Sequence, residues 1–331
     1  GTIDTYLIYR LTNLKHYVTD TTNASRTLLF NCEKNIWDNE LLSVFDVDGI
    51  NLPLVKSSSD NFGESNFDSA FKKDVMICGV AGDAQASFFA NSCFNKGDTK
   101  ITTGTGFNIQ TNIGNKFLID SNFLTSLAFT IDKKNTYALE CLSSFAGATI
   151  SWLKNNLNII NSAAESEEMS NALENNGGVY LVPAFTGLGP PYWKTSAKAA
   201  FFGISATTNK NHIVRASLES VAYQMVVYLE FLANTKNIKP KSLAIDGGMV
   251  KNIFFVQIIA DLLEIEVHIP EIEEMSSYGS LLFGLKKYNN INDFYDLSNF
   301  KLQRKMISPK KNEVISSSYE KWKTIIDKHF L

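Results

Sequence analysis

An aspartate beside a glycine turn is the residue of this sequence best placed for acid–base chemistry. Asp83 follows Gly82 and an apolar, β-branched run at residues 75–80, and residues 84–89 have the composition of a helix start. A carboxylate at a helix N-terminus is stabilised as an anion by the helix dipole, and it can accept a proton from a hydroxyl there. The same position is a common place for a helix-capping aspartate, so this segment alone leaves both interpretations open.

Two glycine turns further along the chain have the design of phosphate-binding loops. Residues 104–106 (G-T-G) lie between two predicted strands, where backbone N–H groups and one hydroxyl can surround phosphate oxygens. Residues 246–248 (D-G-G) lie where a predicted strand at residues 243–245 leads into a helix, a position at which open α/β sheets bind ligands. Asn252 can point into the same crevice. Each turn alone is more often a simple turn, so neither identifies a site by itself.

The elements that must position these residues follow from the apolar periodicity of the second half of the chain. It predicts strands at residues 124–129, 137–139 and 178–182, and helices at residues 145–157, 211–232 and 252–263. Strands that alternate with helices indicate an α/β domain. Nearer the N-terminus, a helix is predicted at residues 4–11 and another helical piece that begins near Trp37.

Composition limits the classes of function. A chain of 331 residues that is 44% hydrophobic can bury one large core or two smaller ones, and we expect two domains with a boundary near residues 90–98. The net charge of −3 is dispersed without a basic stripe, which argues against a nucleic-acid partner. No apolar run approaches the ~20 residues that would span a bilayer, so we expect no membrane partner.

The cysteines and histidines show no ligand pattern. The four cysteines stand singly in apolar surroundings, without a C-x-x-C pair, and the four histidines are scattered. Isolated cysteines of this kind behave as small hydrophobes in a reducing compartment. The expectation is a cytoplasmic protein with neither disulfides nor a zinc site.

A set of collinear motifs gives the sequence a family resemblance. The set includes the A-G-D, G-T-G and D-G-G-M-V-K-N segments described above. It also includes V-T-D-T-T-N-A-S-R-T-L-L-F-N at residues 18–31, V-P-A-F-T-G-L-G-P-P-Y-W at residues 182–193 and the stretch at residues 199–219. Together these motifs resemble those of the FGGY carbohydrate kinase family, and among its members they are most similar to glycerol kinases. The resemblance runs in order from Gly1 to about Leu285, and these motifs in one order are far more specific than any one of them.

The resemblance implies an actin/hexokinase-like (ribonuclease H-like) α/β fold of two domains around a cleft, with ATP and Mg²⁺ as cofactors. Asp83 matches the family's catalytic base, which also helps to organise the metal. By the same resemblance Thr105 reaches the nucleotide phosphates, Gly147 and Gly248 lie against the nucleotide, and Asn252 lies near the adenine. Phosphoryl transfer of this kind depends mainly on positioning and charge neutralisation.

Three positions depart from the family pattern. Ala84, at the substrate side of the site, replaces a glutamine, Asn108 stands where a phenylalanine usually packs against the carbons of glycerol, and Ser151 replaces a glutamine near the nucleotide. The Asp- and Gly/Thr-rich phosphate hairpin and the Arg-Glu pair with which the family's N-terminal domain begins are not among these residues. By resemblance, about the first third of the family's length is absent and the N-terminal domain is incomplete.

The resemblance divides the chain into the end of a substrate domain at residues 1–90 and a nucleotide domain at residues 91–290, and the Lys- and Ser-rich composition of residues 291–331 predicts a peripheral tail. The implied reaction is phosphorylation of a polyol hydroxyl by ATP, with glycerol to glycerol 3-phosphate as the first choice, in a homo-oligomer (dimer or tetramer). The isolated 331 residues are expected to be inactive. Ala84 and Asn108 leave open another polyol or a ketose as acceptor. A non-catalytic nucleotide- or sugar-binding regulator also remains open, because fold does not fix function.

Overall fold

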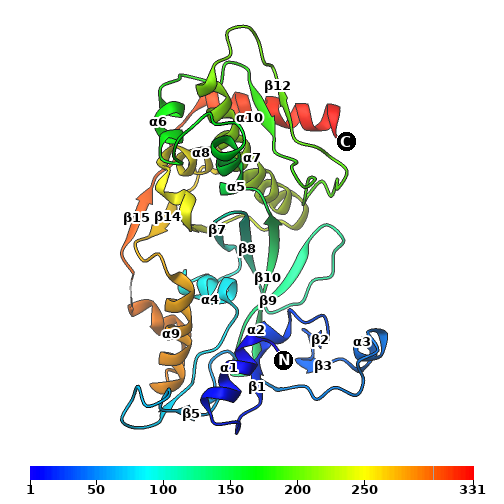
Figure 1. Cartoon of the computed structure of the whole chain (residues 1–331), viewed down its shortest axis with the longest axis vertical. Helices are drawn as coiled ribbons and strands as arrows, with labels where there is room; N and C mark the ends of the chain where they lie inside the picture. Colours follow the sequence, from blue (N-terminus) through cyan, green and yellow to red (C-terminus); the bar gives the residue numbers. More distant parts are fainter. Residues whose placement is uncertain (301) are drawn as a thin grey trace.

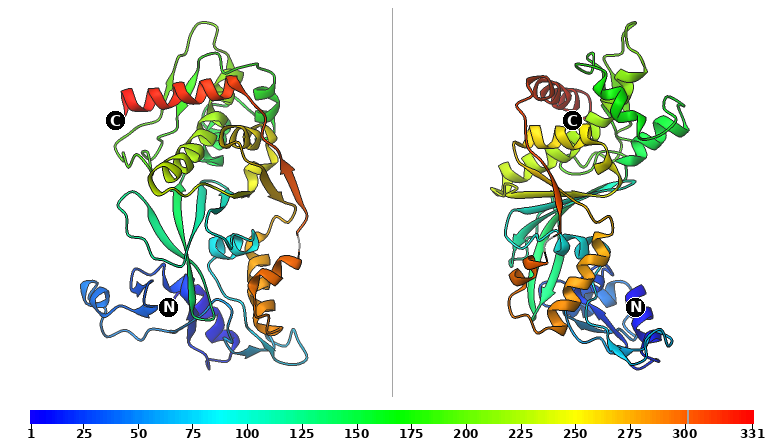
Figure 2. Two further views of the ribbon diagram at one scale, coloured as in Figure 1. Left: turned by 180° about the vertical axis from the view of Figure 1, so that it is seen from behind. Right: turned by 90° about the vertical axis from the view of Figure 1, so that its left-hand side faces the viewer.

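A central β-sheet with helices on both faces forms most of the molecule, and a small lobe built from the first 82 residues lies at one end (Figure 1). The computed structural model describes residues 1–300 and 302–331. Figure 2 shows the sheet edge-on between the two helix layers, with the C-terminal helix at the end far from the small lobe. Among residues 1–300 and 302–331, no helix combines the length and apolar character needed to cross a membrane.

The elements alternate along the chain as an α/β pattern. The helices are α1 (Ile3–Leu11), α2 (Thr21–Ala24), α3 (Asn39–Val44), α4 (Asp83–Ala90), α5 (Gly147–Asn155), α6 (Glu165–Asn171), α7 (Lys210–Lys236), α8 (Ile253–Leu263), α9 (Met275–Tyr288) and α10 (Glu313–His329), with 3₁₀ helices η1 (Gly248–Lys251) and η2 (Phe294–Asn299). The strands are β1 (Val18–Asp20), β2 (Phe30–Asn31), β3 (Ile36–Trp37), β4 (Leu54–Lys56), β5 (Glu64–Ser65), β6 (Val75–Met76), β7 (Asp98–Thr103), β8 (Phe107–Gly114), β9 (Leu124–Ile131), β10 (Lys134–Ser143), β11 (Tyr180–Val182), β12 (Ala200–Phe202), β13 (Ser242–Asp246), β14 (Val267–Pro270) and β15 (Arg304–Ile307).

The main sheet brings the two predicted glycine turns together, because they follow the ends of two neighbouring strands. Its strand order is β15-β14-β13-β7-β8-β10-β9. β13 runs parallel to β7, with Asp246 opposite Thr102, so the two strands end side by side. β7 and β8 are antiparallel and are joined through residues 104–106, as the sequence predicts. The strands predicted around residues 124–129, 137–139 and 243–245 are also confirmed.

On one side of the sheet α5, α7 and α8 enclose the larger hydrophobic core, and α10 packs outside them against α8 and β11 (Figure 2). α7 begins with a capping box in which the Asn209 side chain accepts from the backbone of His212, a favourable start for a long helix. Val221, Met225 and Leu229 on this helix have 0% of their surface exposed. The helix predicted at residues 211–232 is therefore confirmed, and it extends to Lys236.

The opposite face of the sheet is covered by α4 and α9, which pack closely on each other. The rings of Phe89 and Phe283 stack with their centroids 4.0 Å apart. A Cβ at Gly279 would lie 1.9 Å from the backbone oxygen of Ala86, so only glycine permits this approach of α9 to α4. This packing fixes the helix that begins with Asp83.

The prediction that residues 291–331 form a peripheral tail is wrong. β15 pairs with β14 and forms the edge of the main sheet. α10 contributes Tyr319, Trp322 and Ile326 to the larger core, and the Trp322 indole, which is 0% exposed, donates to the Leu181 carbonyl at 2.7 Å. These residues recur at helical spacing, so the apolar face of α10 outweighs the Lys- and Ser-rich composition of the segment.

The small lobe has little core of its own. Its buried hydrophobic cluster consists of Ile8, Val18 and Phe62, and its strands pair two by two. The predicted N-terminal helix is confirmed, whereas Trp37 lies in β3 and the next helix starts only at Asn39, which follows the capping Asp38. The lobe is therefore held largely by contacts to the main sheet.

Candidate active site

Asp83 begins α4 with its carboxylate exposed. Gly82 before it is in an extended conformation and supplies no side-chain cap, and Asp83 Oδ1 accepts from the backbone N–H of Ala84 at 2.7 Å. Within residues 1–300 and 302–331 the carboxylate forms no ion pair with a lysine or arginine side chain. Asp83 is therefore the first residue of α4 and not its cap, so the capping interpretation is wrong, and the exposed carboxylate is available to a ligand.

Buried polar side chains of the sheet lie beneath α4. Asp246 at the end of β13 accepts from Ser87 Oγ at 2.7 Å and from Asn91 Nδ2 at 3.1 Å, both on α4. Lys100 is 0% exposed and its Nζ donates to the Ala84 carbonyl at 3.3 Å. Burial lowers the pKa of Lys100, and the nearby Asp246 carboxylate opposes that shift. Asp246 thus connects the helix of Asp83 with the D-G-G turn that follows β13.

The G-T-G turn is fixed against the start of α5. The Gly147 N–H donates to the Gly104 carbonyl at 3.0 Å, and the Thr105 carbonyl accepts from Ala146 and Ala148 at 2.9 Å each. A Cβ at Gly147 would lie 2.6 Å from the Gly104 oxygen, so glycine is required for this contact. The exposed Thr105 side chain is left free of this packing and can reach a ligand.

The D-G-G turn opens toward the same region. Gly247 has a φ of 94°, and a Cβ there would meet the Thr103 oxygen at 2.3 Å. Gly248, which begins η1, has no atom within 4 Å of its ideal Cβ position. The space beside Gly248 is therefore open to a ligand and not filled by protein.

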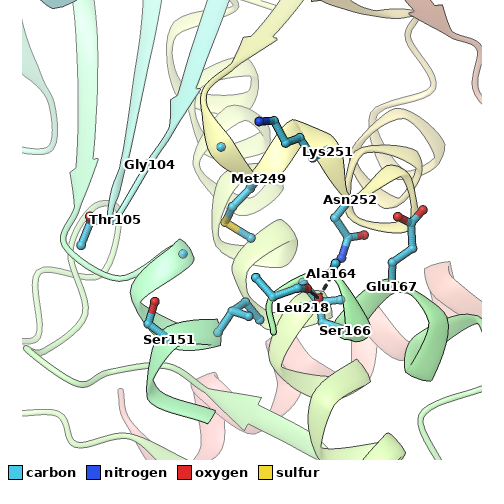
Figure 3. A pocket seen from close by; sticks show the side chains of 14 residues that line it. Gly104, Thr105, Ser151, Ala164, Ser166, Glu167, Leu218, Met249, Lys251 and Asn252 are labelled. Carbon is cyan, nitrogen blue, oxygen red and sulfur yellow. Dashed lines mark hydrogen bonds between the residues drawn. The ribbon is translucent and has the colours of Figure 1, made fainter. Parts of the chain in front are cut away.

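A cavity of about 450 Å³ lies between these two turns (Figure 3). It is lined by Gly104, Thr105, Gly147, Ile150, Ser151, Ala163, Ala164, Ser166, Glu167, Leu218, Gly248, Met249, Lys251 and Asn252. All five residues that the sequence assigned to the nucleotide, namely Thr105, Gly147, Ser151, Gly248 and Asn252, are in this lining. Asp83 and Ala84 are not in it, and they lie at the start of α4 instead.

Asn252 has a structural role in addition to any ligand contact. Its Oδ1 accepts from the Phe255 N–H at 3.0 Å as the cap of α8, and its Nδ2 donates to Ser166 Oγ at 3.1 Å (Figure 3). Glu167 Oε1 accepts from the Ile253 N–H at 3.0 Å. One Nδ2 hydrogen and one Oδ1 lone pair of Asn252 remain for a ligand.

Sequence reasoning missed the far wall of the cavity. Ser166 and Glu167 belong to α6, a short helix without an apolar stripe, and Ile150 and Leu218 read only as core residues of α5 and α7. The polar E-S-E-E-M-S-N segment gave no signal for ligand binding. Contacts of α6 with α7 and with the start of α8 bring it to the pocket.

Two of the three positions that depart from the family pattern lie on different sides of the sheet. Ser151 lies in the cavity lining, and Asn108 lies on the face of the sheet that α4 covers. Phe107 is buried in the larger core, so Asn108, the next residue of β8, points to the α4 side. Its buried Oδ1 has no hydrogen-bond partner among the described residues. Ala84 is half-buried beside Asp83.

A comparison with protein families decides the identity of the chain. The model of the FGGY family of carbohydrate kinases, C-terminal domain, matches residues 100–288, and that of its N-terminal domain matches residues 1–90. The chain belongs to the FGGY family of carbohydrate kinases. The resemblance to this family inferred from the motifs is therefore confirmed, and so is the actin-like α/β fold.

Among curated relatives, this FGGY chain is 40% identical over 330 residues to glycerol kinase 1 of Thermotoga maritima, covering 99% of the chain and 67% of the relative. It is 42% identical over 281 residues to the glycerol kinase of Staphylococcus epidermidis, covering 85% of the chain and 56% of the relative. The chain thus spans two thirds or less of the length of these relatives.

Solved structures superpose on almost the whole chain. The structure of Plasmodium falciparum glycerol kinase with ADP gives a TM-score of 0.92 at 29% identity and covers 100% of this chain and 67% of that one. A xylulose kinase from Lactobacillus acidophilus gives a TM-score of 0.85 at 20% identity, covering 98% of this chain and 67% of that one, which shows a shared fold.

Proposed function

We propose that the protein carrying this chain is an ATP-dependent kinase that phosphorylates a polyol hydroxyl, with glycerol as the first acceptor. The observation that carries the proposal is the bridge made by Asp246. Its side chain holds α4, which begins with Asp83, and its backbone leads into the Gly247-Gly248 turn of the cavity. One residue therefore relates the proposed base to the proposed nucleotide site.

The cavity suits a nucleotide. Its deeper wall is apolar, with Ile150, Leu218 and Met249, and an aromatic base packs well against such side chains. Glycine turns at 104–106 and 247–248 leave backbone close to the ligand, which suits a phosphate chain. In the proposed arrangement ATP lies with its adenosine against this wall, and Asn252, Ser151 and Gly147 are near it.

The proposed phosphate end lies toward the two turns. The Thr105 hydroxyl and the backbone beside Gly248 contact phosphate oxygens in this arrangement. Lys251 also lines the cavity and lies across it from Thr105 (Figure 3), although its Nζ is shared with Glu273 at 2.9 Å. A cation at this position favours a polyanionic ligand.

In the proposed reaction Asp83 accepts the proton of the acceptor hydroxyl while that oxygen attacks the γ-phosphorus, and the bond from the γ-phosphorus to the β–γ bridging oxygen breaks so that ADP leaves. A base of this kind contributes about 10²–10⁴-fold to the rate. The exposed Asp83 carboxylate also fits the needs of Mg²⁺, which is commonly held by one or two carboxylates together with phosphate oxygens. When bound, that ion would neutralise phosphate charge.

Ala84 and Asn108 bear on the choice of acceptor. Ala84 beside the base cannot donate a hydrogen bond to a terminal hydroxyl, and Asn108 offers an amide on the α4 side of the sheet. Loss of one hydrogen bond costs about 0.5–1.5 kcal/mol, roughly a three- to tenfold drop in affinity. Glycerol therefore stays the first candidate, and an acceptor with more carbons and hydroxyls is the second.

We propose that the acceptor-binding and nucleotide-binding parts of the chain meet at the predicted boundary near residues 90–98. Residues 1–90 contribute to the acceptor side, and residues 91–290 form the nucleotide side. The cavity supports this assignment, because its lining residues all lie between Gly104 and Asn252.

The test is kcat/KM of the complete natural protein with ATP and a panel of glycerol, erythritol, xylitol and ketopentoses, with the phosphorylated product identified by ³¹P NMR. We expect ATP-dependent phosphorylation of glycerol or of a four- or five-carbon acceptor. A lead for glycerol of more than ~100-fold would refute the argument from Ala84 and Asn108. Absence of phosphoryl transfer to every acceptor, with ATP binding intact, would refute the kinase proposal in favour of a regulator.

A further inference from the structure

The turn before Asp83 is held by a hydroxyl from the small lobe. The backbone N–H of Gly82 donates to Thr22 Oγ1 at 2.8 Å, although 60 residues separate the two in sequence. Thr22 lies on α2 and is 0% exposed. This contact reaches the residue immediately before the proposed base, and the motif that contains it, T-D-T-T-N-A-S-R-T, has no part in the proposed function so far.

A buried carboxylate fixes the direction of this hydrogen bond. Asp20 is 0% exposed and accepts from Thr22 Oγ1 at 2.8 Å, from the backbone N–H groups of Thr22 and Asn23 at 3.0 and 2.9 Å, from Asn23 Nδ2 at 2.8 Å and from Ser58 Oγ at 2.7 Å. Burial raises the pKa of Asp20, and the hydrogen bonds from Asn23, Ser58 and the Thr22 N–H oppose that shift. When Asp20 is ionised it only accepts, and the Thr22 hydroxyl hydrogen then points to it. The lone pairs of the hydroxyl are then left for the N–H of Gly82.

The backbone carbonyls of the next two residues, Asp83 and Ala84, accept hydrogen bonds from two other elements. The Asp83 carbonyl accepts from Ser276 Oγ of α9 at 2.9 Å, and the Ala84 carbonyl accepts from Lys100 Nζ of β7 at 3.3 Å. Three consecutive residues are thus anchored from three separate parts of the fold. The anchor at Gly82 is the one that comes from the small lobe, so it couples the place of that lobe to the place of the carboxylate.

We propose that Thr22, oriented by Asp20, is a positioning residue for Asp83. The hydroxyl holds the peptide that precedes the base, and thereby sets where the carboxylate stands relative to the acceptor hydroxyl. The proposal rests on the proposed function of Asp83. It assigns to the buried Asp20–Thr22 pair a role in turnover beyond capping the short helix α2.

The first test compares kcat and KM in Thr22→Val, Thr22→Ser and Thr21→Val variants of the complete natural protein. Thr21 is a matched control, because it is the neighbouring residue of α2 and its hydroxyl bonds to Thr130 Oγ1 at 2.9 Å, away from the turn. A displacement of ~1 Å at a reacting group can cost about 10²-fold in rate. We expect kcat to fall at least ~10-fold in Thr22→Val with KM for ATP within about twofold, and Thr22→Ser and Thr21→Val to retain most of the activity.

The second test does not depend on activity. Amide hydrogen exchange should show loss of protection at Gly82 in Thr22→Val, with unchanged exchange in β7 and α9, whereas Thr21→Val should keep Gly82 protected. If Thr22→Val does not fold, Thr22→Cys replaces it, because a thiol is of similar size and its sulfur is a weak acceptor. We expect the same losses in Thr22→Cys.

Two outcomes would overturn the inference: wild-type kcat in a folded Thr22→Val protein, or an equal loss in Thr22→Val and Thr21→Val, which would indicate a purely structural role. The proposed function fails separately, through retained activity in Asp83→Asn. Loss of activity in Asp83→Asn together with full activity in Thr22→Val would therefore refute only the positioning role.

Discussion

Replacement of Gly248 by valine should block nucleotide binding without harm to the fold. An ideal Cβ at this position meets no atom within 4 Å, so the added side chain would project into the cavity and not into protein. Gly247, one residue earlier, behaves in the opposite way, because its Cβ would meet the Thr103 oxygen at 2.3 Å. The structure thus separates a glycine with open space at its Cβ position from one required by the backbone.

The expected magnitude follows from where the clash falls. Extra methyl groups forced into a packed site cost about 1–3 kcal/mol, which corresponds to roughly 5- to 150-fold in Kd. In Gly248→Val we expect this cost to fall on the bound nucleotide, because no protein atom lies within 4 Å of the Cβ position. Gly248→Ala adds only the Cβ and should therefore weaken ADP binding by less than Gly248→Val does.

The assay is calorimetric titration of ADP into the complete natural protein and its variants. Gly49→Val is the matched control, because the Cβ of Gly49 also meets nothing within 4 Å and this residue lies in the loop after α3, away from the cavity. We expect the control to bind as the wild type does. Unchanged ADP affinity in Gly248→Val would refute the placement of the nucleotide in this cavity.

Three further outcomes are expected. The 331 residues by themselves should show no appreciable phosphoryl transfer, because the family's phosphate hairpin and Arg-Glu pair are not among them; ordinary kinase turnover of the isolated chain would contradict this. Amides of residues 1–82 should exchange faster than those of β7 and β8, because the cluster of Ile8, Val18 and Phe62 is small; equal protection would be evidence against this. Trp322→Ala should lower the free energy of unfolding in urea by about 3–5 kcal/mol, and a loss below ~1 kcal/mol would show that α10 does not hold the core.

The elements that carry the site were largely predictable from sequence, because local patterns determine them. The G-T-G hairpin, the strand before D-G-G and the helix that Asn252 caps all follow from turn chemistry and apolar periodicity. The apolar, β-branched run at residues 75–80 forms a strand only over Val75–Met76. Residues 77–80 bond irregularly to the small lobe through the N–H groups of Ile77 and Val80.

The remainder depends on contacts that no local pattern encodes. α6 is brought to the cavity by bonds to α7 and to the start of α8, and its polar sequence resembles that of any exposed helix. α10 was misjudged from composition, although the spacing of Ile315, Tyr319, Trp322 and Ile326 was readable as one apolar face. The contact between Thr22 and Gly82 joins residues far apart in sequence, so only the fold reveals it.

The most direct test of the central claim is the kcat of Asp83→Asn in the complete natural protein with ATP and its best acceptor. Asparagine keeps the size of the side chain and can still accept from the Ala84 N–H, so the fold should be unchanged by circular dichroism. Because the basic carboxylate is gone, we expect kcat to fall at least ~10²-fold, with little change in ADP affinity. Near-wild-type turnover by a folded Asp83→Asn protein would contradict the account.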